Sequence, residues 1–500
     1  MGRTIRPIAE HGRRTAVWFA LFQAHAGPAR SLRDRICAAV REAVQSGRVG
    51  NGARLPASRT MARDLQVSRI TVEAAYAQLE AEGYLRRRVG DGTFVRVDVW
   101  PPHRAPAVKP AARRRHETAA WSVRGGRIVH GGGCIDPTTA TAFSAGFPDL
   151  TEFPLDTWRR LTAHRLRGAP AILGYGDPAG ESALRAAIAR YLAQSRGVRC
   201  GPEQVLVLTS SQQALNLAAT LLTDPDDVVW LEEPGYRGAQ TALGAMGARL
   251  TPLPVDQEGM ILRASRDGAA PRLIYVTPSH QYPTGVTLSL PRRLALIEYA
   301  QRHGAWIVED DYDGEFQYDA RPLPAMQGLD THDRVIYLGT FTKVLFPGLR
   351  LAYLVLPPAL VSGFVTARSA HDGHSARLAQ LVTADFMEQG YFAAHLRRMR
   401  KLYQQRRDLL LDEIRRHIGD WCRPLNSAAG LQFTVTLPRG REAVLTHAAA
   451  QVGVDTPGLS ERFLSRPRLD GWILGFAALR EDAIVEGVRR LAKVRVAHRR

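Results

Sequence analysis

The sequence predicts two folded parts: a small α+β module near the N-terminus, followed by a larger α/β domain with a mainly parallel sheet. Helical periodicity in residues 31–81 and a hairpin pattern in residues 84–97 predict the first part. From residue 205 onward, short apolar runs of strand type alternate with helical patterns, which predicts the second part. Charge follows the same division, because residues 1–115 hold 22 Lys+Arg and 9 Asp+Glu, a net +13 of the chain's +19.

Composition excludes several classes of protein. With 500 residues and 45% hydrophobic content, the chain is long and apolar enough for two or three domains with large cores. The cysteines at 37, 134, 200 and 422 have neither disulfide-framework nor metal-site spacing. No apolar run approaches the ~18 residues of a membrane span, and the run at 17–22 is too short for a signal peptide. We therefore expect a cytoplasmic protein without a metal site.

The N-terminal part is predicted to contain three helices and a hairpin. The first helix runs from Ser31 to the glycine at 47, a short helix covers residues 57–65, and Ser68 caps a helix at 69–81. One buried stripe of the last helix is formed by Val72, Ala75, Tyr76 and Leu79. Its exposed N-terminal end is where a recognition helix presents residues to the major groove. On the hairpin, Arg86–Arg88 are expected to face phosphates.

These residues resemble a known DNA-binding domain. The pattern LPASRxMAxxLxVSRxTVxxAYxQLExEGYL…GxGTFV at about 31–97 closely resembles the winged helix-turn-helix of GntR-type bacterial regulators. The resemblance implies that residues 15–98 bind double-stranded DNA. By the same resemblance, the DNA-contacting positions are Arg59, Ser68, Arg69, Thr71 and Gly92. The alternative is a three-helix module that serves protein contacts, on a chain that is generically rich in arginine.

Residues 99–138 are predicted to be a linker. Pro, Ala and Arg dominate this stretch, and no apolar period is visible. We expect an extended tether. Its arginines at 113–115 either touch DNA or keep the tether solvated.

In the second part, polar residues follow the strands. Buried strands are predicted at Val205–Leu208, Val228–Leu231, Leu273–Val276, Trp306–Val308 and Val335–Leu338. The fourth strand ends in EDDY (309–312), and the fifth is followed by TFTK (340–343). In an open α/β sheet the carboxyl ends of the strands form the ligand crevice. An acid, a phenol, two hydroxyls and a lysine are therefore expected at one crevice.

Lys343 is the candidate nucleophile of this crevice. The chain has 67 Lys+Arg but only four lysines, at 109, 343, 401 and 493, and only Lys343 follows a predicted strand. Arginine cannot act as an amine nucleophile, whereas a Schiff base requires a lysine amine. The alternative is an ordinary surface lysine.

The landmarks of the second part together resemble a fold-type I aminotransferase that depends on pyridoxal 5'-phosphate. They are, in order, a phosphate turn, a stacking tyrosine, a PTG loop, D-x-Y, T-x-T-K and an arginine seven residues later. The resemblance implies an aminotransferase class I/II-like domain at residues 139–500. Fused to the winged helix, this domain is identified as a member of the MocR/GabR subfamily of GntR regulators.

The resemblance also implies roles for individual residues. Lys343 would carry the cofactor as a Schiff base, Asp310 would pair with its ring nitrogen, Tyr312 would bind its ring hydroxyl, and Tyr236 would stack on its ring. Tyr175 would reach the phosphate from the partner subunit. The residues that would hold the phosphate within the chain are Ser211, Gln212, Thr340, Thr342 and Arg350. His280 is either a loop histidine or a further cofactor contact.

Two positions depart from the family pattern. Tyr282 replaces the asparagine that contacts the ring hydroxyl in ordinary aminotransferases. Ile473 replaces the arginine that clamps the substrate's α-carboxylate, and an aliphatic side chain cannot pair a carboxylate. Either Arg480 or Arg377 substitutes for it, or the ligand lacks an α-carboxylate, or the ligand is pyridoxal phosphate itself.

We therefore expect a transcription regulator that binds promoter DNA as a head-to-tail homodimer. Its aminotransferase-like domain would sense an amine, through an external aldimine, or pyridoxal phosphate. One alternative is an active aminotransferase with an appended DNA-binding domain, against which the loss of the carboxylate clamp argues. The other is a regulator with no cofactor, whose pocket serves only dimerisation.

Overall fold

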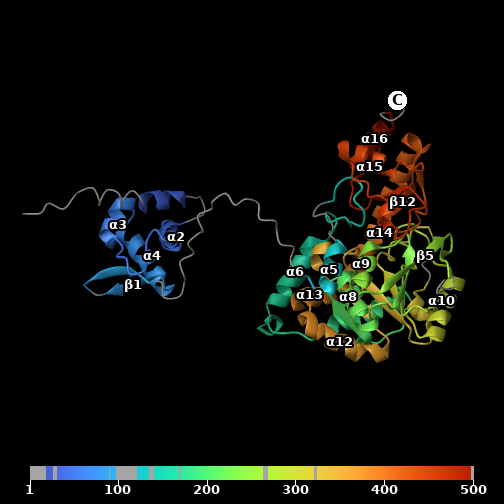
Figure 1. Ribbon diagram of the computed structural model, residues 1–500, viewed down its shortest axis with the longest axis horizontal. Helices are drawn as coiled ribbons and strands as arrows, with labels where there is room; N and C mark the ends of the chain where they lie inside the picture. The colour runs from blue at the N-terminus through green and yellow to red at the C-terminus, as the bar shows by residue number, and fades with distance from the viewer. Residues whose placement is uncertain are drawn as a thin grey trace, which may run out of the picture. The chain divides into compact units, whose positions relative to one another are not determined.

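The computed structural model describes residues 18–25, 31–88, 90–96, 121–133, 140–167, 170–262, 269–319 and 324–496 (Figure 1). The chain divides between residues 119 and 120 into two compact units, which are described separately. Among the described helices, none has the length and apolar character needed to cross a membrane.

The N-terminal unit has the predicted helices and hairpin. The helices are α2 (Leu32–Gln45), α3 (Ser58–Leu65) and α4 (Arg69–Ala81), and strands β1 (Leu85–Arg88) and β2 (Gly92–Val95) pair antiparallel. Side chains from all five elements and from residues 18–22 form one buried core, to which α4 contributes its predicted stripe. Ser31 and Ser68 cap α2 and α4 by accepting hydrogen bonds from backbone N–H groups.

The large unit contains an eight-stranded, mainly parallel sheet, as predicted. Its strand order is β3-β10-β9-β8-β7-β4-β5-β6. Strands β9, β8, β7, β4 and β5 are mutually parallel, whereas β10 runs antiparallel to both its neighbours and β6 antiparallel to β5. The strands are β3 (Val205–Leu208), β4 (Val228–Glu233), β5 (Arg249–Asp256), β6 (Gly259–Met260), β7 (Leu273–Val276), β8 (Trp306–Asp311), β9 (Val335–Thr340) and β10 (Ala352–Val355).

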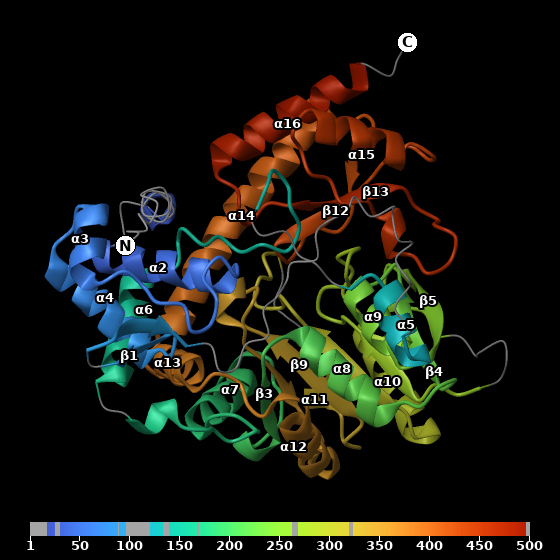
Figure 2. The same cartoon turned by 60° about the vertical axis from the view of Figure 1, so that its left-hand side comes forward.

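Helices cover both faces of this sheet (Figure 2). On one face, α8 (Ser211–Leu222), α9 (Arg237–Ala245) and α12 (Pro358–Asp372) share a core with the strands. The helices on the other face are α7 (Ser182–Ser195), α10 (Leu290–His303) and α13 (Arg377–Glu388). Because both faces are buried, β3 and β7 are continuous apolar runs rather than alternating ones, and β4 and β9 each begin with four apolar residues. Two further helices of this unit are α6 (Leu155–Leu166) and α11 (Met326–Leu329).

A smaller sheet lies in the C-terminal part of the large unit. It is antiparallel, with the order β11-β12-β13. Its strands are β11 (Arg423–Pro424), β12 (Gln432–Thr436) and β13 (Gly471–Gly475), and its helices are α15 (Glu442–Gln451) and α16 (Glu481–Val496). The 27-residue helix α14 (Tyr391–His417) contributes to the same core and runs beside α16 (Figure 2).

The predicted extended linker is wrong in one part. Residues 123–130 form helix α5, whose N-cap Ser122 accepts a hydrogen bond from the N–H of Gly125 at 3.0 Å. The helix packs on α9, and Thr241 Oγ1 donates to the carbonyl of Gly131 at 3.4 Å. The glycine pair at 125–126 lowers helix propensity, and no residue of α5 is buried, so the sequence lacked an apolar period. Residues 99–120 and 134–138 of the predicted linker lie outside the described residues.

Candidate cofactor site and nucleic-acid interface

The ends of β8 and β9 meet as the sequence predicted. Asp310 pairs in register with Leu338, and Asp311 with Gly339, so the polar residues after both strands lie at one edge of the sheet. Lys343 follows β9 by three residues, and its Nζ donates to the carbonyl oxygen of Gly146 at 2.8 Å. A Cβ at Gly146 would sit 2.9 Å from this Nζ, and its φ of +78° also favours glycine. The backbone at Gly146 thus closes directly over the lysine amine.

Asp310 is buried with one oxygen unpaired. Tyr275 Oη donates to its Oδ2 at 2.8 Å, while Oδ1 has no hydrogen-bond partner among the described residues. Burial raises the pKa of Asp310 to about 7, although the hydrogen bond from Tyr275 and the charge of Lys343 oppose the rise. An unpaired, buried acceptor near a lysine fits a ligand that brings a charged N–H group.

Four rings form a chain of contacts in this part of the unit. Tyr236 and Tyr282 meet edge to face with centroids 5.7 Å apart, and Tyr282 meets Tyr312 in the same way at 6.1 Å. His280 stacks on Tyr312 at 5.9 Å. Tyr282 therefore packs between the two tyrosines that were predicted to contact the cofactor ring.

His280 belongs to a buried polar chain. Its Nδ1 lies 3.0 Å from Tyr312 Oη and 3.0 Å from Asp313 Oδ1, while its Nε2 has no partner among the described residues. Sequence reasoning left His280 undecided and missed Asp313 and Tyr275. Asp313 lies three residues after Asp310 and could have been found, but Tyr275 sits inside an apolar strand and carried no polar signal.

The predicted phosphate residues come from two loops. Ser211 and Gln212 open helix α8, whose cap Ser210 accepts from the N–H of Gln213. Gln212 Nε2 donates to the carbonyl of Gly238 at 3.0 Å, and its Oε1 has no partner among the described residues. In the second loop, the N–H of Thr342 donates to Thr340 Oγ1 at 3.1 Å. A helix N-terminus beside hydroxyl groups suits an anion.

Two predicted phosphate residues have exposed side chains. Arg350 is exposed and holds a left-handed conformation with φ of +54°. Tyr175 is 97% exposed and touches His374 edge to face at 6.0 Å.

Ile473 is fully buried in β13, where it pairs with Thr434 of β12. Gln432 lies two residues before Thr434, on the same side of β12. It is 4% exposed, and its Oε1 has no hydrogen-bond partner among the described residues. A Cβ at Gly146 would lie 3.6 Å from this oxygen, so Gln432 faces the lysine site.

Neither arginine proposed to replace the carboxylate clamp occupies this place. Arg377 Nε donates to Glu181 at 2.6 Å, and the carbon of its side chain lies against Gly176. The side chain of Arg480 is 82% exposed, beside Asp482.

Three of the five predicted DNA-binding residues, Ser68, Arg69 and Thr71, lie at the start of α4. Ser68 Oγ accepts from the N–H of Thr71 at 3.1 Å, and Arg69 Nε donates to Ser58 Oγ at 3.4 Å from a side chain that is 54% exposed. Arg59 is exposed on α3, and Gly92, with φ of +120°, starts β2 against Arg54.

Arg87, in the middle of the hairpin's arginine run, is exposed as expected. Its guanidinium also lies 3.2 Å from the carboxylates of both Glu73 and Glu80, which would compete with phosphates for it. Arg86 and Arg88 are exposed, and Arg88 also covers the ring of Phe94 at 5.3 Å.

Comparisons with known proteins agree with this arrangement. The model of bacterial regulatory proteins of the gntR family matches residues 32–95, and that of aminotransferase class I and II matches residues 139–454. The chain is 43% identical to the probable rhizopine catabolism regulatory protein MocR of Rhizobium meliloti, over 90% of this chain and 91% of that protein. It is 29% identical to the pyridoxine biosynthesis transcriptional regulator PdxR of Corynebacterium glutamicum, over 91% and 94%.

A solved structure is similar to the large unit. LysN, an α-aminoadipate aminotransferase from Thermus thermophilus complexed with N-(5'-phosphopyridoxyl)-L-leucine, superposes with a TM-score of 0.68 and 30% identity. The match covers 75% of this chain and 97% of LysN.

Proposed function

This chain belongs to the MocR-type regulators of the gntR family, which join a DNA-binding domain to an aminotransferase-like domain, and we propose that it senses an amine through pyridoxal 5'-phosphate held on Lys343. It is a DNA-binding transcription regulator, and its aminotransferase domain implies pyridoxal phosphate as the cofactor. The assignment of individual residues and the sensing of an effector are the proposal.

The unpaired Oδ1 of Asp310 is the observation that carries the proposal. A buried carboxylate without a second partner is unfavourable alone, but it would pair with the protonated ring nitrogen of the cofactor. When bound, the cofactor supplies an aldehyde that condenses with amines and a ring that withdraws electrons. Lys343 would hold it covalently, Tyr236 would cover its ring, and Tyr312 would hold its hydroxyl in an orientation fixed by His280.

The phosphate would bind at the start of α8 and in the loop after β9. Ser211 and Gln212 would offer backbone N–H groups, Thr340 and Thr342 hydroxyls, and Arg350 a guanidinium. Tyr175 would complete this site from the partner subunit, which its 97% exposure supports. A homodimer of this kind would carry two DNA-binding units and recognise a promoter with two half-sites in the bacterial cytoplasm.

The effector we propose is an amine without an α-carboxylate. Ile473 occupies the position of the usual arginine clamp, so a carboxylate would have no cationic partner there. A second candidate effector is pyridoxal phosphate itself, which the relative named for regulation of pyridoxine biosynthesis favours.

An active aminotransferase is the second candidate function. The similarity to LysN favours it, because the lysine, the acid and the tyrosines it would need are all present. The lack of a carboxylate clamp argues against turnover of common amino acids, since productive geometry requires the substrate to be held. Steady-state keto-acid production from a panel of amino acids would establish this function.

Spectral titration of the purified protein, run beside DNA binding, tests the main proposal. The cofactor-loaded protein should absorb near ~420 nm, Lys343→Ala should lose this band, and Lys401→Ala should keep it. Amines without a carboxylate should shift the band and change the affinity for DNA from the protein's own upstream region. If gel shifts respond to neither cofactor nor amine, the sensing role is wrong, although the DNA-binding role stands.

A further inference from the structure

A cavity of about 200 Å³ opens in the large unit, and its lining includes none of the residues assigned above to the cofactor. Three elements form it: the end of α7, the turn after β8 and the N-terminal part of α14. Water occupies about 30 Å³ per molecule, so the cavity has room for about six waters or one small organic ion.

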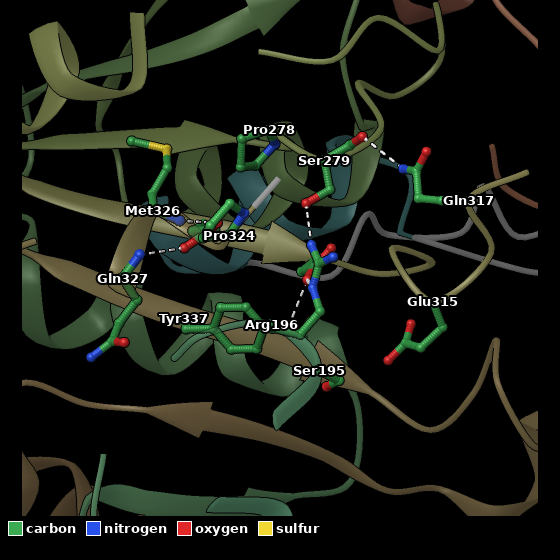
Figure 3. A network of polar contacts seen from close by, with 12 residues as sticks. Ser195, Arg196, Pro278, Ser279, Glu315, Gln317, Pro324, Met326, Gln327 and Tyr337 are labelled. Atoms are coloured by element: carbon green, nitrogen blue, oxygen red, sulfur yellow. Dashed lines mark hydrogen bonds and ion pairs between the residues drawn. The ribbon is translucent and has the colours of Figure 1, made fainter. Parts of the chain in front are cut away.

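The floor of the cavity is a buried arginine with an unused donor. Arg196 is 3% exposed, and its Nε and Nη2 donate to Asp311 Oδ2 at 2.7 Å and to Ser279 Oγ at 2.6 Å. Figure 3 shows this guanidinium with Ser279, Glu315 and Tyr337 around it. Its Nη1 has no hydrogen-bond partner among the described residues. A buried N–H without an acceptor costs about 1–3 kcal/mol, which a bound oxyanion would offset.

The wall adds more positive charge. Arg397 and Arg400 of α14 line the cavity, and no carboxylate in the described part of the chain pairs with either. Arg400 donates instead to the backbone carbonyl of Glu315 at 2.7 and 3.0 Å. The Glu315 carboxyl accepts a hydrogen bond from Tyr191 Oη at 3.0 Å, and desolvation raises its pKa above the usual value. The three guanidinium groups therefore have only two carboxyl groups near them in the described part of the chain, those of Asp311 and Glu315.

We propose that this cavity binds a small oxyanion, either phosphate or the carboxylate of a small organic acid, between Arg196, Arg397 and Arg400. The site goes beyond the proposed function, because the anion would be a second ligand with its own binding place. It would also touch the cofactor site indirectly. Arg196 pairs with Asp311, which directly follows Asp310 on β8. An anion bound to the Arg196 guanidinium would therefore weaken the ion pair between Arg196 and Asp311.

Calorimetric titration of the cofactor-loaded, full-length protein tests the site. Loading fills the cofactor's own phosphate place, so inorganic phosphate and succinate, added at constant ionic strength, can report only on other sites. The variant Arg397→Ala with Arg400→Ala should weaken binding about 100-fold, since each charge-assisted hydrogen bond is worth about tenfold. The control is Arg398→Ala with Lys401→Ala, which removes the same charge from exposed positions of the same helix outside the cavity.

The outcomes separate clearly. Saturable binding of either anion that is lost in the first variant and kept in the second supports the site, and the anion that binds identifies its source as inorganic phosphate or an organic acid. Binding that both variants keep, or that both lose equally, would show general attraction to a basic surface and overturn the proposal. The absence of saturable binding up to millimolar concentrations of both anions would overturn it as well.

Discussion

Replacing Asp310 by asparagine should stabilise the cofactor-free protein at pH 8 and weaken its binding of the cofactor. Both effects come from one buried carboxylate whose Oδ1 has no partner among the described residues. Without the cofactor the charge is a cost, and with the cofactor it becomes half of an ion pair. Asparagine keeps the shape and the acceptor for Tyr275 but removes the charge.

The magnitude follows from the pKa. Burial raises the pKa of Asp310 from 3.8 to about 7, so the folded protein keeps a proton that the unfolded chain has lost between these values. The free energy of unfolding therefore falls as pH rises from about 4 to about 7, by about 4 kcal/mol at most. Since the unsatisfied amide of asparagine costs about 1–3 kcal/mol, the net gain of Asp310→Asn should be about 1–3 kcal/mol at pH 8 and close to zero at pH 5.

Urea unfolding of the cofactor-stripped protein at pH 5 and pH 8 measures the first effect, and absorbance titration with pyridoxal phosphate measures the second. Loss of the charge-assisted hydrogen bond should raise the cofactor's Kd about 10- to 150-fold. Asp156→Asn is the control, because the Asp156 side chain is 94% exposed and should change neither quantity. The role given to Asp310 would be refuted if the variant's free energy of unfolding changed with pH as much as that of the wild type, or if its Kd for the cofactor were unchanged.

Three further substitutions have defined outcomes. Arg69→Ala should weaken operator binding by about 1–3 kcal/mol in gel shifts if it contacts a base, and unchanged affinity removes it from the interface. Gly146→Ala should slow formation of the ~420 nm band, because the new methyl group would meet Lys343 Nζ at 2.9 Å; an unchanged rate would mean that the backbone at Gly146 moves away. Ile473→Arg should create detectable binding of α-amino acids in the spectral titration, and a variant that folds but still ignores them would show that the missing clamp is not what excludes carboxylates.

The strands and the residues at their ends could be predicted because each signal is local. Buried parallel strands are unbroken apolar runs, and β3 and β7 begin and end where the sequence predicted. The cap Ser68 likewise places α4 at residues 69–81, because a hydroxyl before an apolar period serves the free N–H groups of the first turn. Helix α5 could not be found in this way, since its support comes from α9, more than 100 residues later.

Side-chain partners on neighbouring elements could not be predicted from the sequence, because these contacts also depend on residues far apart in the chain. Glu73 and Glu80 hold Arg87, but nothing in the run Arg86–Arg88 distinguishes the middle arginine. Tyr275 could not be matched to Asp310, because their contact depends on β7 lying beside β8. Residues that act through the register of neighbouring strands need the structure, whereas residues that act at the ends of strands do not.

For the proposed effector, the face of the small sheet near Lys343 is a stronger constraint than the absence of one arginine. Gln432 and Ile473 are both buried there, and neither carries a charge. The amide of Gln432 can turn to present its oxygen or its NH₂ group, so it can pair a hydroxyl or an amide, but it cannot neutralise a carboxylate. A carboxylate placed between these two side chains would lose its hydration without gaining a cation, which costs several kcal/mol. A neutral polar group on the effector would meet no such cost, and the same face therefore favours a hydroxylated or amide-bearing amine over an amino acid.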